Sequence, residues 1–408
     1  MIPLATSLLD GLGRVDARAD VFTGVQVDSR RVADGDLFVA VGRGAEFLDD
    51  AVAAGAAVTL VPGDAFAALA RIARAVRERS NAKVVGITGS MGKTSTKDIL
   101  AALCASSSTR TIAAEASYNN EIGVPLTLCR LEEDTEVCIL ELAMRGVGQI
   151  AELCEVARPQ IGVVTNVGPV HLELVDSIEG VRRAKGEVIA ALPPGGTAIV
   201  PVDFPVERAD IEIVRIGTPE AEAADGRTVV GGVSFNFTAR HQALNAAAAL
   251  AALDALGLQR PASVEVDFAR WRGEEAELPG GGLLINDAYN ANPVSMRAAL
   301  EYLAERAGDR RRVAILGDMA ELGRTGPGYH LEVGRAAAEL GVDELLAVGE
   351  LARGYLESGV PGRWAASVHE ALREVDEVVR PGDAVLVKAS RAVGLEAVAE
   401  ALSGIPAR

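Results

Sequence analysis

The segment 84–96, VVGITGSMGKTST, constrains this chain more than any other, because an apolar β-branched run is followed by glycines directly before Lys93. A buried strand over 84–88 and a helix over 94–104 would leave a glycine-rich turn between them. Such a turn points backbone N–H groups and a helix N-terminus at one place, where the lysine adds a cation. We therefore predict that this turn binds phosphate groups, with the hydroxyl of Thr94 as a ligand for Mg²⁺.

The match to the phosphate-loop pattern G-x-x-x-x-G-K-[ST] is imperfect, because Ile87 stands where the first glycine belongs. The alternative is a strand-to-helix turn with an incidental lysine. The strand before the turn and the helical spacing of Ile99, Leu100 and Leu103 favour the phosphate site. The residues expected around the phosphates are those of the shorter turn and of the helix start: Gly89, Ser90, Gly92, Lys93, Thr94 and Ser95.

The length of 408 residues is too great for one hydrophobic core and suits two or three domains. Hydrophobic residues make up 49% of the chain and aromatic residues only 4%, which is typical of α/β proteins with buried parallel strands. The formal net charge of −17 argues against a general nucleic-acid binder, because such proteins need a basic surface. An anionic ligand must therefore be held by a local group of residues.

The four cysteines, Cys104, Cys129, Cys138 and Cys154, lie in apolar or helical contexts without C-x-x-C spacing. They are expected to be buried thiols of a reducing compartment, and no zinc site is indicated. Residues 1–20 lack a basic region and a long apolar core, and no stretch approaches about 18 uninterrupted apolar residues. We therefore expect a cytoplasmic protein that does not insert into membranes.

Alternating strands and helices predict three α/β domains, 1–80, 81–258 and 259–408. In the first domain we expect strands at 21–27, 37–41 and 57–61 and a helix at 66–79. In the second we expect, beside the segment 84–104, strands at 137–142, 161–166 and 197–200 and helices at 187–192 and 242–256.

The segment 257–263, GLQRPAS, resembles a linker, because glycine ends a helix and proline follows it. In the third domain we expect strands at 283–285, 313–316, 344–348 and 384–387 and helices at 293–306, 330–340 and 394–402. The alternation in the second domain predicts a mostly parallel, doubly wound sheet, and the third domain is expected to be a further α/β unit.

Three side chains are candidates for a metal site beside the phosphates. Glu141 stands at the carboxyl edge of a strand, where doubly wound sheets bind ligands, although a solvated glutamate is the alternative. His171 follows another strand, but a lone loop histidine is more often a structural hydrogen-bonding residue than a metal ligand. Lys185 is expected at the start of a helix, where a surface ion pair with Glu187 or a neighbouring carboxylate is the plain interpretation.

Two amide-rich loops are further candidates for contacts with a substrate. Asn119 and Asn120 precede an apolar helix, so that capping of the helix is the default and a substrate contact is the alternative. In the last domain, Asp287, Asn290 and Asn292 end a strand and open a helix, where turn and cap chemistry is again the default.

Together these motifs resemble the Mur ligases, ATP-dependent enzymes that form amide bonds in peptidoglycan precursor synthesis. The resemblance covers nearly the whole chain and is carried by TGSMGKTSTK, YNNEIGVPLTL, ELAMRGVGQI, TNVGPVHLE followed by RAKGE, DAYNANP, LGDMAELG and VKASR. Within the family these segments are similar to the members that join D-alanyl-D-alanine to UDP-N-acetylmuramoyl-tripeptide. The resemblance implies a three-domain α/β architecture with a P-loop mononucleotide-binding central domain and a Rossmann-like C-terminal domain.

The resemblance also implies residue roles. Lys93 would bind the β- and γ-phosphates, and Thr94 and Glu141 would hold one Mg²⁺. His171 and Lys185, a carbamylated lysine in the family, would hold a second Mg²⁺, which reverses the plain interpretation of both residues. The other matching positions are His241, Asn245, Arg272 and Asp287 for the nucleotide, and Ser29, Arg30, Asn120, Asn290, Lys388, Ser390 and Arg391 for the substrates.

In the implied reaction, ATP converts a substrate carboxylate into an acyl phosphate, which the amine of D-alanyl-D-alanine then attacks. The implied partners are the UDP-linked tripeptide and the dipeptide, without nucleic acid, and a monomer is expected. Another amide ligase of Mur or folylpolyglutamate type is an alternative, although the latter lacks a domain before the phosphate loop. A non-catalytic nucleotide-binding paralogue is disfavoured by the joint presence of Glu141, His171 and Lys185.

Three features depart from the family pattern. The segment between Lys185 and His241 is short, so that strands of the central domain are expected to be missing or trimmed. Gln242 stands where asparagine is usual, and Trp271 replaces the glycine that usually precedes Arg272. We expect altered packing around the nucleotide. The sequence does not determine the peptide-binding surface of the central domain.

Overall fold

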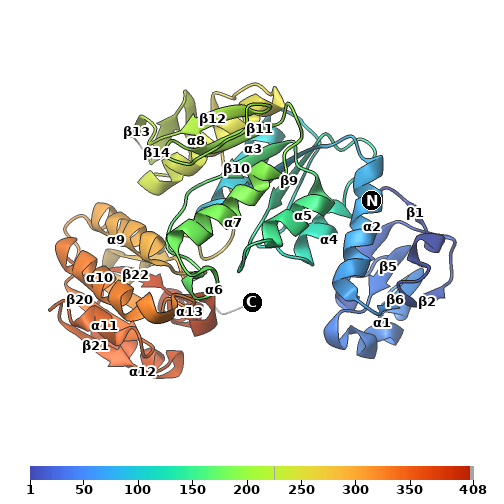
Figure 1. Cartoon of the computed structure of the whole chain (residues 1–408). Coiled ribbons are helices and arrows are strands. Elements are labelled where there is room, and N and C mark those ends of the chain that lie inside the picture. Colours follow the sequence, from blue (N-terminus) through green and yellow to red (C-terminus); the bar gives the residue numbers. More distant parts are fainter. Residues whose placement is uncertain (225, 405–408) are drawn as a thin grey trace. The chain divides into compact units, whose positions relative to one another are not determined.

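The computed structural model describes residues 1–224 and 226–404, which form two compact units (Figure 1). The first unit comprises Met1–Asn166, Arg182–Thr238 and Gln242–Asp267. The second unit comprises Val167–Val181, Ala239–His241 and, of the C-terminal part, the described residues 268–404. The predicted domain boundaries near residues 80 and 258 remain predictions.

The N-terminal part of the first unit contains a four-stranded sheet in the order β2-β6-β5-β4. Its strands are β2 (Gly13–Ala17), β4 (Gly24–Gln26), β5 (Asp36–Val39) and β6 (Val58–Pro62), and β1 (Leu4–Ala5) pairs separately with β3 (Val21–Phe22). The predicted strands 37–41 and 57–61 are confirmed as β5 and β6, whereas 21–27 is divided at Thr23 between two sheets. Strand β2 escaped prediction because its side chains are mostly exposed.

Two helices accompany this sheet, α1 (Leu48–Ala53) and α2 (Ala65–Arg79). Helix α2 confirms the predicted helix at 66–79. It begins after Asp64, whose carboxylate accepts hydrogen bonds from the backbone N–H groups of Phe66 and Ala67 at 2.9 and 3.0 Å. An aspartate in this position satisfies N–H groups that the first helical turn leaves without partners.

The central sheet of the first unit has six strands in the order β12-β11-β10-β7-β9-β8, and all its pairs are parallel. The strands are β7 (Lys83–Thr88), β8 (Thr111–Ala113), β9 (Val137–Glu141), β10 (Ile161–Val164), β11 (Thr197–Pro201) and β12 (Glu212–Ile216). Strands β7, β9, β10 and β11 confirm the four that the apolar runs predict. Strand β7 lies between β9 and β10, so that later strands of the chain are added on both of its sides. This change of direction makes β7 a switch point of the sheet. A ligand crevice forms at the carboxyl end of such a switch point.

The central helices are α3 (Lys93–Ser106), α4 (Gly123–Leu128), α5 (Gln149–Ala157), α7 (Ile178–Ala190) and α8 (Arg240–Leu256), and the short α6 is Leu172–Val175. The predicted helices at 94–104 and 242–256 are confirmed as α3 and α8. The expectation that Lys185 opens a helix is wrong, because α7 begins at Ile178. The first turns of α7 carry charged residues that weaken the apolar pattern on which the prediction rested.

The segment between Lys185 and His241 contains strands β11 and β12 and part of a second, four-stranded sheet. That sheet has the order β13-β14-β15-β16 and consists of β13 (Ala221–Ala224), β14 (Arg227–Val230), β15 (Val233–Phe235) and β16 (Ser263–Val264). Strands are thus present here, and trimming relative to the family remains a prediction. The predicted linker 257–263 is wrong at its end, because Ser263 pairs in parallel with Ser234 of β15.

The second unit contains a six-stranded sheet in the order β17-β18-β22-β19-β20-β21, parallel except for the edge strand β17. The strands are β17 (Glu274–Leu278), β18 (Gly282–Asn286), β19 (Arg312–Gly317), β20 (Glu344–Val348), β21 (Gly362–Ala365) and β22 (Ala384–Lys388). The four predicted strands are confirmed as β18, β19, β20 and β22. The two edge strands, β17 and β21, were missed because neither has an apolar β-branched run: β17 is EEAEL and β21 is GRWA.

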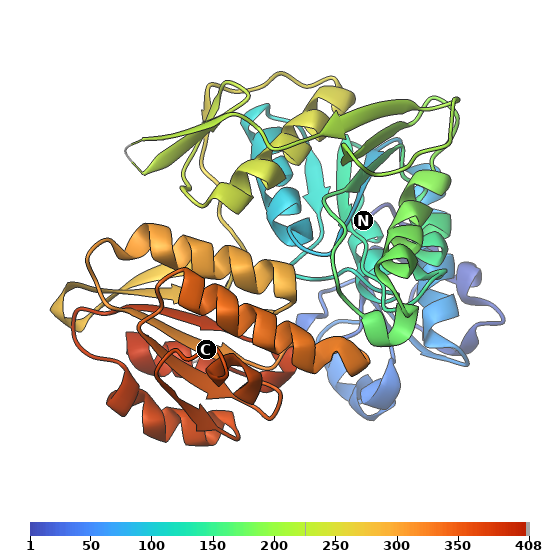
Figure 2. The ribbon, with the colours of Figure 1, turned by 60° about the vertical axis from the view of Figure 1, so that its left-hand side comes forward.

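The helices of this unit are α9 (Pro293–Ala307), α10 (Gly326–Glu339), α11 (Arg353–Leu356), α12 (Val368–Val378) and α13 (Glu396–Ser403). Helices α9 and α10 cover one face of the sheet, and α12 and α13 cover the other (Figures 1 and 2). Successive residues of β19 alternate between these cores: Ala314 and Leu316 pack with the first pair of helices, Val313 and Ile315 with the second. This doubly wound arrangement confirms the predicted α/β class.

All four cysteines are buried and free, as predicted from their apolar contexts. Burial raises the pKa of the Cys104 thiol to about 11 and the pKa values of the other three to about 12. Within residues 1–224 and 226–404, none of the helices combines the length and apolar character that crossing a membrane requires.

His330 on α10 is fully buried, and its position generates a prediction for stability against pH. Its Nε2 accepts a hydrogen bond from the Met319 N–H at 3.0 Å, and its Nδ1 lies 2.7 Å from the carbonyl oxygen of Gly326. These contacts require a neutral ring, and burial lowers the pKa of His330 below its ordinary value of 6.5. Between about pH 6.5 and the lower folded-state pKa, His330 is therefore protonated in the unfolded chain and neutral in the folded chain.

We predict that the second unit loses stability as the pH falls from about 6.5 toward the lower folded-state pKa of His330. Each unit of pKa difference corresponds to about 1.4 kcal/mol. Denaturant unfolding at pH 7.5 and 5.5 measures the loss, and His330→Gln should reduce the pH dependence. The exposed His369 supplies the control, since His369→Gln should leave the pH dependence unchanged. Equal slopes for wild type and His330→Gln would contradict the assignment.

Candidate active site

The turn between β7 and α3 has the geometry of an anion site. Gly89 and Gly92 adopt positive φ angles of 151° and 78°, and Gly92 is the N-cap residue of α3. Because the N-cap residue is a glycine, it offers no side-chain acceptor to the N–H groups of the first turn of α3. Such an N-terminus of a 14-residue helix favours an anion through both its N–H groups and its dipole.

The residues after β10 hold this turn in place. The Asn166 Oδ1 atom accepts hydrogen bonds from the N–H groups of Ser90 and Met91, both at 3.0 Å. The Thr165 hydroxyl donates to the Met91 carbonyl at 2.6 Å. Thr165 and Asn166 reach the turn because β10 pairs in parallel with β7, so that both strands end at the same edge. These two residues were not among the predicted site residues.

Both glycines are required by close contacts as well as by their φ angles. A Cβ atom on Gly89 would lie 1.8 Å from the Thr165 hydroxyl oxygen, and one on Gly92 would lie 2.1 Å from the Asn245 Oδ1 atom. Asn245 is buried on α8 and donates to the Gln242 Oε1 atom at 2.9 Å. The predicted nucleotide residue Asn245 therefore packs against the glycine turn.

The predicted phosphate residues lie around this turn. The Lys93 ammonium donates to the Gly89 carbonyl at 2.8 Å and so folds back across the turn. The buried Ser95 hydroxyl accepts a long, 3.5 Å hydrogen bond from the Gln242 side-chain amide. Gln242 thus adds a contact between α8 and the start of α3, which gives a packing role to one of the residues that depart from the family pattern.

Thr94 and Glu141, predicted as ligands of one Mg²⁺, meet in the structure. The Thr94 hydroxyl donates to the Glu141 Oε2 atom at 2.8 Å, and both residues are almost fully buried. They meet because β9 pairs with β7 in a register that places Glu141 opposite Ile87, at the edge where the turn begins. The Asn119 amide donates to the other carboxylate oxygen, Oε1, at 2.8 Å.

The donor chemistry at this point fits Mg²⁺. A hydroxyl and a carboxylate are hard oxygen ligands, and Mg²⁺ in nucleotide sites takes few protein ligands, with phosphates and water as the others. Among the residues that the structure describes, no three histidine, cysteine, aspartate or glutamate side chains converge on one point.

Lys185 lies inside α7 and is 2% exposed. Burial, aided by the nearby Lys93 ammonium, lowers the pKa of Lys185 well below its ordinary value. Within the described part of the chain its amine makes no hydrogen bond or ion pair, so that the expected surface ion pair with Glu187 is absent. The Glu187 carboxylate instead accepts from the N–H groups of Gly148 and Ala151, at the start of α5.

His171 belongs to the second unit, whereas the other predicted metal residues belong to the first. It adopts a left-handed φ of 53° before the short helix α6, and its Nδ1 atom contacts the Glu321 Oε2 atom. Glu321 also has a left-handed φ, of 61°, and its carbonyl accepts the Glu173 N–H at 3.3 Å. Strained residues of this kind cluster at functional sites.

Three predicted residues of the second unit form one cluster at the carboxyl end of its sheet. The buried Lys388 ammonium contacts the Asp287 carboxylate at 2.6 Å and the Asn290 carbonyl at 2.8 Å. Next to them, the Ser390 hydroxyl accepts the Ala320 N–H at 2.9 Å. The cap of α9 is formed by Asn292, whose side chain accepts a backbone N–H of the first helical turn, as turn chemistry predicts.

Arg391 and Arg272 are both held by aromatic rings. The Arg391 guanidinium lies 4.5 Å from the centre of the Trp271 ring and pairs with Glu396 at 2.6 Å, and Arg272 lies 4.1 Å from the Tyr289 ring. Trp271 has a positive φ of 61°, a conformation that favours glycine and is an outlier for so large a residue. The expected change in packing at this position is therefore an aromatic stack that glycine cannot make.

His241 lies at the start of α8 and is assigned to the second unit, apart from Asn245. Its ring meets the Tyr302 ring edge to face at a centroid distance of 6.3 Å. Burial lowers the pKa of His241, against an opposing effect of Asp287. The ring therefore favours its neutral form.

The predicted substrate residues of the N-terminal part are less engaged. The exposed Arg30 pairs with Asp28 of its own loop at 2.7 Å, and this contact lowers the pKa of Asp28 to about 2. Ser29 opens a short 3-10 turn beside it. Asn120 caps α4 by accepting the Gly123 N–H at 3.0 Å, which is the default interpretation, and the neighbouring Asn119 is the residue that reaches Glu141.

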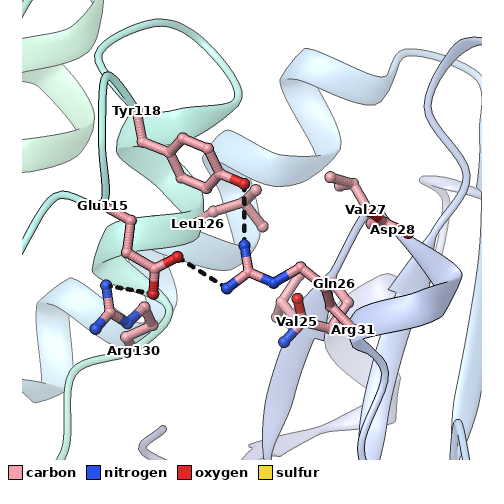
Figure 3. A pocket seen from close by; sticks show the side chains of 9 residues that line it. All are labelled: Val25, Gln26, Val27, Asp28, Arg31, Glu115, Tyr118, Leu126 and Arg130. Carbon is pink, nitrogen blue, oxygen red and sulfur yellow. Dashed lines mark hydrogen bonds and ion pairs between the residues drawn. The ribbon is translucent and has the colours of Figure 1, made fainter. Parts of the chain in front are cut away.

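A cavity of about 150 Å³ is lined by Asp28 and Arg31, and Arg30 is not among its lining residues (Figure 3). The sequence offered one signal for this cavity, a second arginine directly after the DSR motif, and no signal that the segment around Glu115 faces it. The lining residues are Val25, Gln26, Val27, Asp28, Arg31, Glu115, Tyr118, Leu126 and Arg130.

Replacing Gly92 tests the glycine turn. Gly92→Ala places a side chain in a left-handed conformation, at about 1 kcal/mol, and also displaces the Asn245 amide. Gly195 is a matched control for the backbone cost alone, because it has a φ of 77° and an added Cβ atom there would have open space among the described residues. We expect Gly195→Ala to lower the melting temperature by about 2–4 °C and Gly92→Ala to lower it further and to abolish stabilisation by ADP. Equal effects of both variants would contradict the contact with Asn245.

Comparisons with known proteins agree with this geometry. Residues 87–253 match the model of the Mur ligase middle domain, and residues 271–391 match that of the Mur ligase, glutamate ligase domain. A UDP-N-acetylmuramoyl-tripeptide--D-alanyl-D-alanine ligase of Synechocystis sp. is 34% identical over 92% of this chain and 90% of its own length.

Solved structures give the same result. MurF from Acinetobacter baumannii superposes with a TM-score of 0.86 at 27% identity, over 98% of this chain and 99% of that protein. MurF ligase from Thermotoga maritima in complex with ADP has a TM-score of 0.81 at 27% identity, over 94% of this chain and 97% of that one. The architecture is the three-domain architecture expected from the sequence motifs, with a P-loop central domain and a Rossmann-like C-terminal domain. This chain belongs to the Mur ligase family.

Proposed function

We propose that this chain joins D-alanyl-D-alanine to UDP-N-acetylmuramoyl-tripeptide, with ATP converted to ADP and phosphate, in peptidoglycan precursor synthesis. The relatives that match most of the chain carry this activity in their names, and one matching structure contains ADP. The observation that carries the proposal is the glycine turn at the start of α3 beside the buried Thr94–Glu141 pair, because it combines the geometry of a phosphate site with hard oxygen ligands.

The proposed chemistry has two balanced steps. A carboxylate oxygen of the tripeptide attacks the γ-phosphorus of ATP, and the bond from that phosphorus to the oxygen of ADP breaks. The amine of the dipeptide then attacks the acyl carbon, phosphate leaves, and the amine loses a proton. ATP supplies the activated phosphoryl group, and the protein supplies position and charge.

Residues around the turn would carry the first step. Lys93 would exchange its bond to the Gly89 carbonyl for the phosphate oxygens and neutralise charge that develops on them. The N–H groups at the start of α3 would bind the same phosphates. Thr94 and Glu141 would hold one Mg²⁺, with the Glu141 carboxylate fixed by Asn119 from its other side.

A second Mg²⁺ requires more of His171 and Lys185. A carboxylate on the Nδ1 atom of a histidine is the usual device that fixes the tautomer for metal binding through Nε2, and Glu321 has that place at His171. Lys185 as an ammonium would repel the ion. Its lowered pKa favours the neutral amine, which is the form that reacts with carbon dioxide to give a carbamate with two oxygen donors.

We also propose that the second unit supplies the remaining ligand contacts. Asp287 and Arg272 would bind the nucleotide, whereas Lys388, Ser390 and Arg391 would lie near the incoming dipeptide. We propose domains at 1–80, 81–258 and 259–408, a cytoplasmic location and a monomeric state. Analytical ultracentrifugation of the purified protein tests the last of these.

The activity is tested with purified protein, ATP, Mg²⁺ and UDP-N-acetylmuramoyl-tripeptide, with and without D-alanyl-D-alanine. We expect phosphate release to depend on both peptides and the product mass to show the added dipeptide. Both the lysine-containing and the diaminopimelate-containing tripeptide should be supplied. Hydrolysis of ATP that needs neither peptide would favour a nucleotide-dependent switch instead.

Lys93→Ala should lower turnover by about 100-fold or more while the melting temperature stays near that of the wild type, because the lost contact acts on developing phosphate charge. Lys83→Ala is the control, since Lys83 lies at the opposite, amino end of β7, where its ammonium contacts the Leu256 carbonyl at 3.3 Å. Near-native turnover of Lys93→Ala would overturn the role of this lysine.

The carbamate has a separate test. Incubation of the wild type with ¹³C-labelled bicarbonate should give a carbamate signal in the NMR spectrum that Lys185→Ala lacks. Because the neutral amine is the reacting form, the signal should grow as the pH rises through the lowered pKa of Lys185. Lys185→Ala should lose most activity and regain part of it with a short carboxylic acid such as formate. Full activity without rescue, or no labelled signal in the wild type, would contradict the carbamate.

A further inference from the structure

The loop 114–120, AEASYNN, connects the cavity of Figure 3 with the buried carboxylate of Glu141. On the cavity side, the Arg31 guanidinium contacts two residues of this loop, the Glu115 carboxylate at 2.8 Å and the Tyr118 hydroxyl at 3.1 Å. Arg130 contacts the other oxygen of Glu115 at 3.2 Å and the Ala113 carbonyl at 3.1 Å. Arg31 is therefore joined to this loop at two points.

The other end of the loop reaches the proposed magnesium ligands. The Asn119 amide donates to the Glu141 Oε1 atom at 2.8 Å, and the Asn119 carbonyl accepts the Ala143 N–H at 2.9 Å. Glu141 in turn accepts from Thr94 at the start of α3. Tyr118, which contacts Arg31, and Asn119, which contacts Glu141, are consecutive residues, so that a movement of the first displaces the second.

The loop is held firmly enough to transmit a displacement. The buried Lys97 ammonium donates to the Ala114 carbonyl at 2.8 Å, and Ala116 adopts a left-handed φ of 43°. A Cβ atom on Gly123 would lie 2.4 Å from the Tyr118 Cα atom, so that the loop packs tightly against the start of α4. Packed elements of this kind shift as units rather than deform gradually.

We infer that Arg31 is a positioning residue that acts through the loop 114–120 on the orientation of Glu141. The inference rests on the proposed function, because it gives the cavity side of the first unit a part in that reaction. A polar group of a substrate that enters the cavity would compete with Glu115 and Tyr118 for the same guanidinium. Binding of that substrate group in the cavity would then change the orientation of Glu141 beside the phosphate turn.

A purely local ion pair would behave differently. The side chains of Arg31 and Glu115 are 47% and 40% exposed, and ion pairs with this exposure contribute little to stability. Loss of a local pair should therefore leave both the melting temperature and the phosphate turn unchanged. Arg43 and Glu46 form such an exposed pair at 2.7 Å in the same N-terminal part, which makes Arg43→Ala the matched control.

A double-mutant cycle tests the coupling between Arg31 and Asn119. We expect Arg31→Ala and Asn119→Ala each to lower kcat by about 10-fold, and the double variant to lower it by about the same factor, because both changes release the same contact to Glu141. Arg31→Lys keeps the charge but loses the two-pronged geometry and should fall between wild type and Arg31→Ala. Arg43→Ala should equal the wild type.

A second readout does not depend on turnover. The melting temperature is measured with ADP and a chelator, and again with ADP and Mg²⁺. We expect the additional stabilisation by Mg²⁺ to fall by half or more in Arg31→Ala and Asn119→Ala and to be retained in Arg43→Ala. Unchanged stabilisation by Mg²⁺ in Arg31→Ala would overturn the inference.

The outcomes separate the inference from the proposed function. A loss of about 100-fold in the double variant means that the two residues act independently, because independent effects multiply. A rise in KM for the UDP-linked substrate without a fall in kcat means that Arg31 only binds substrate. Either result overturns the coupling. Absence of product from the wild type overturns the proposed function, while the magnesium-dependent melting temperatures still decide whether Arg31 acts on Glu141.

Discussion

The site depends on the close approach of two side chains to the glycines of one turn. Thr165 and Asn245 occupy the space that Cβ atoms on Gly89 and Gly92 would fill, at 1.8 and 2.1 Å. They hold the turn against the end of β10 and against α8, while the N-cap residue of α3 is a glycine, which has no side chain to cap the helix. The backbone N–H groups are thus fixed before a ligand arrives, which removes ordering from the cost of binding.

The carboxyl edge of the central parallel sheet brings hydrogen-bond partners to the buried charge of Glu141. Strands β9, β7 and β10 are neighbours, so that Glu141, the glycine turn and Asn166 gather at their carboxyl ends. The carboxylate of Glu141 is satisfied by Thr94 and Asn119, whereas the amine of Lys185 is buried without such partners in the described part of the chain and has a lowered pKa. Burying a cationic group without a partner costs folding free energy, and groups with strongly shifted pKa values are common at functional sites.

Prediction succeeded where local pattern and tertiary environment coincide. The buried strands β7, β9, β19 and β20 show continuous apolar runs, and helix α3 shows regular spacing after its glycine turn. It failed at edge strands such as β17 and β21, which lack an apolar β-branched run. It also failed at Lys185, because the polar first turns of α7 obscure where that helix begins. Among site residues, the roles of Arg30 and Asn120 that the motifs imply remain predictions, and their neighbours Arg31 and Asn119 contact Tyr118 and Glu141.

The amino-acid order was sufficient for the phosphate turn, the α/β class and the family, because the spacing of glycine, lysine and hydroxyl residues along one strand and helix is local information. Three features came from tertiary packing instead: Asn119 fixes Glu141, Asn245 and Thr165 close the turn, and Arg31 meets the loop 114–120. These contacts join residues far apart in the chain, and strand order and register, which no local pattern encodes, bring them together.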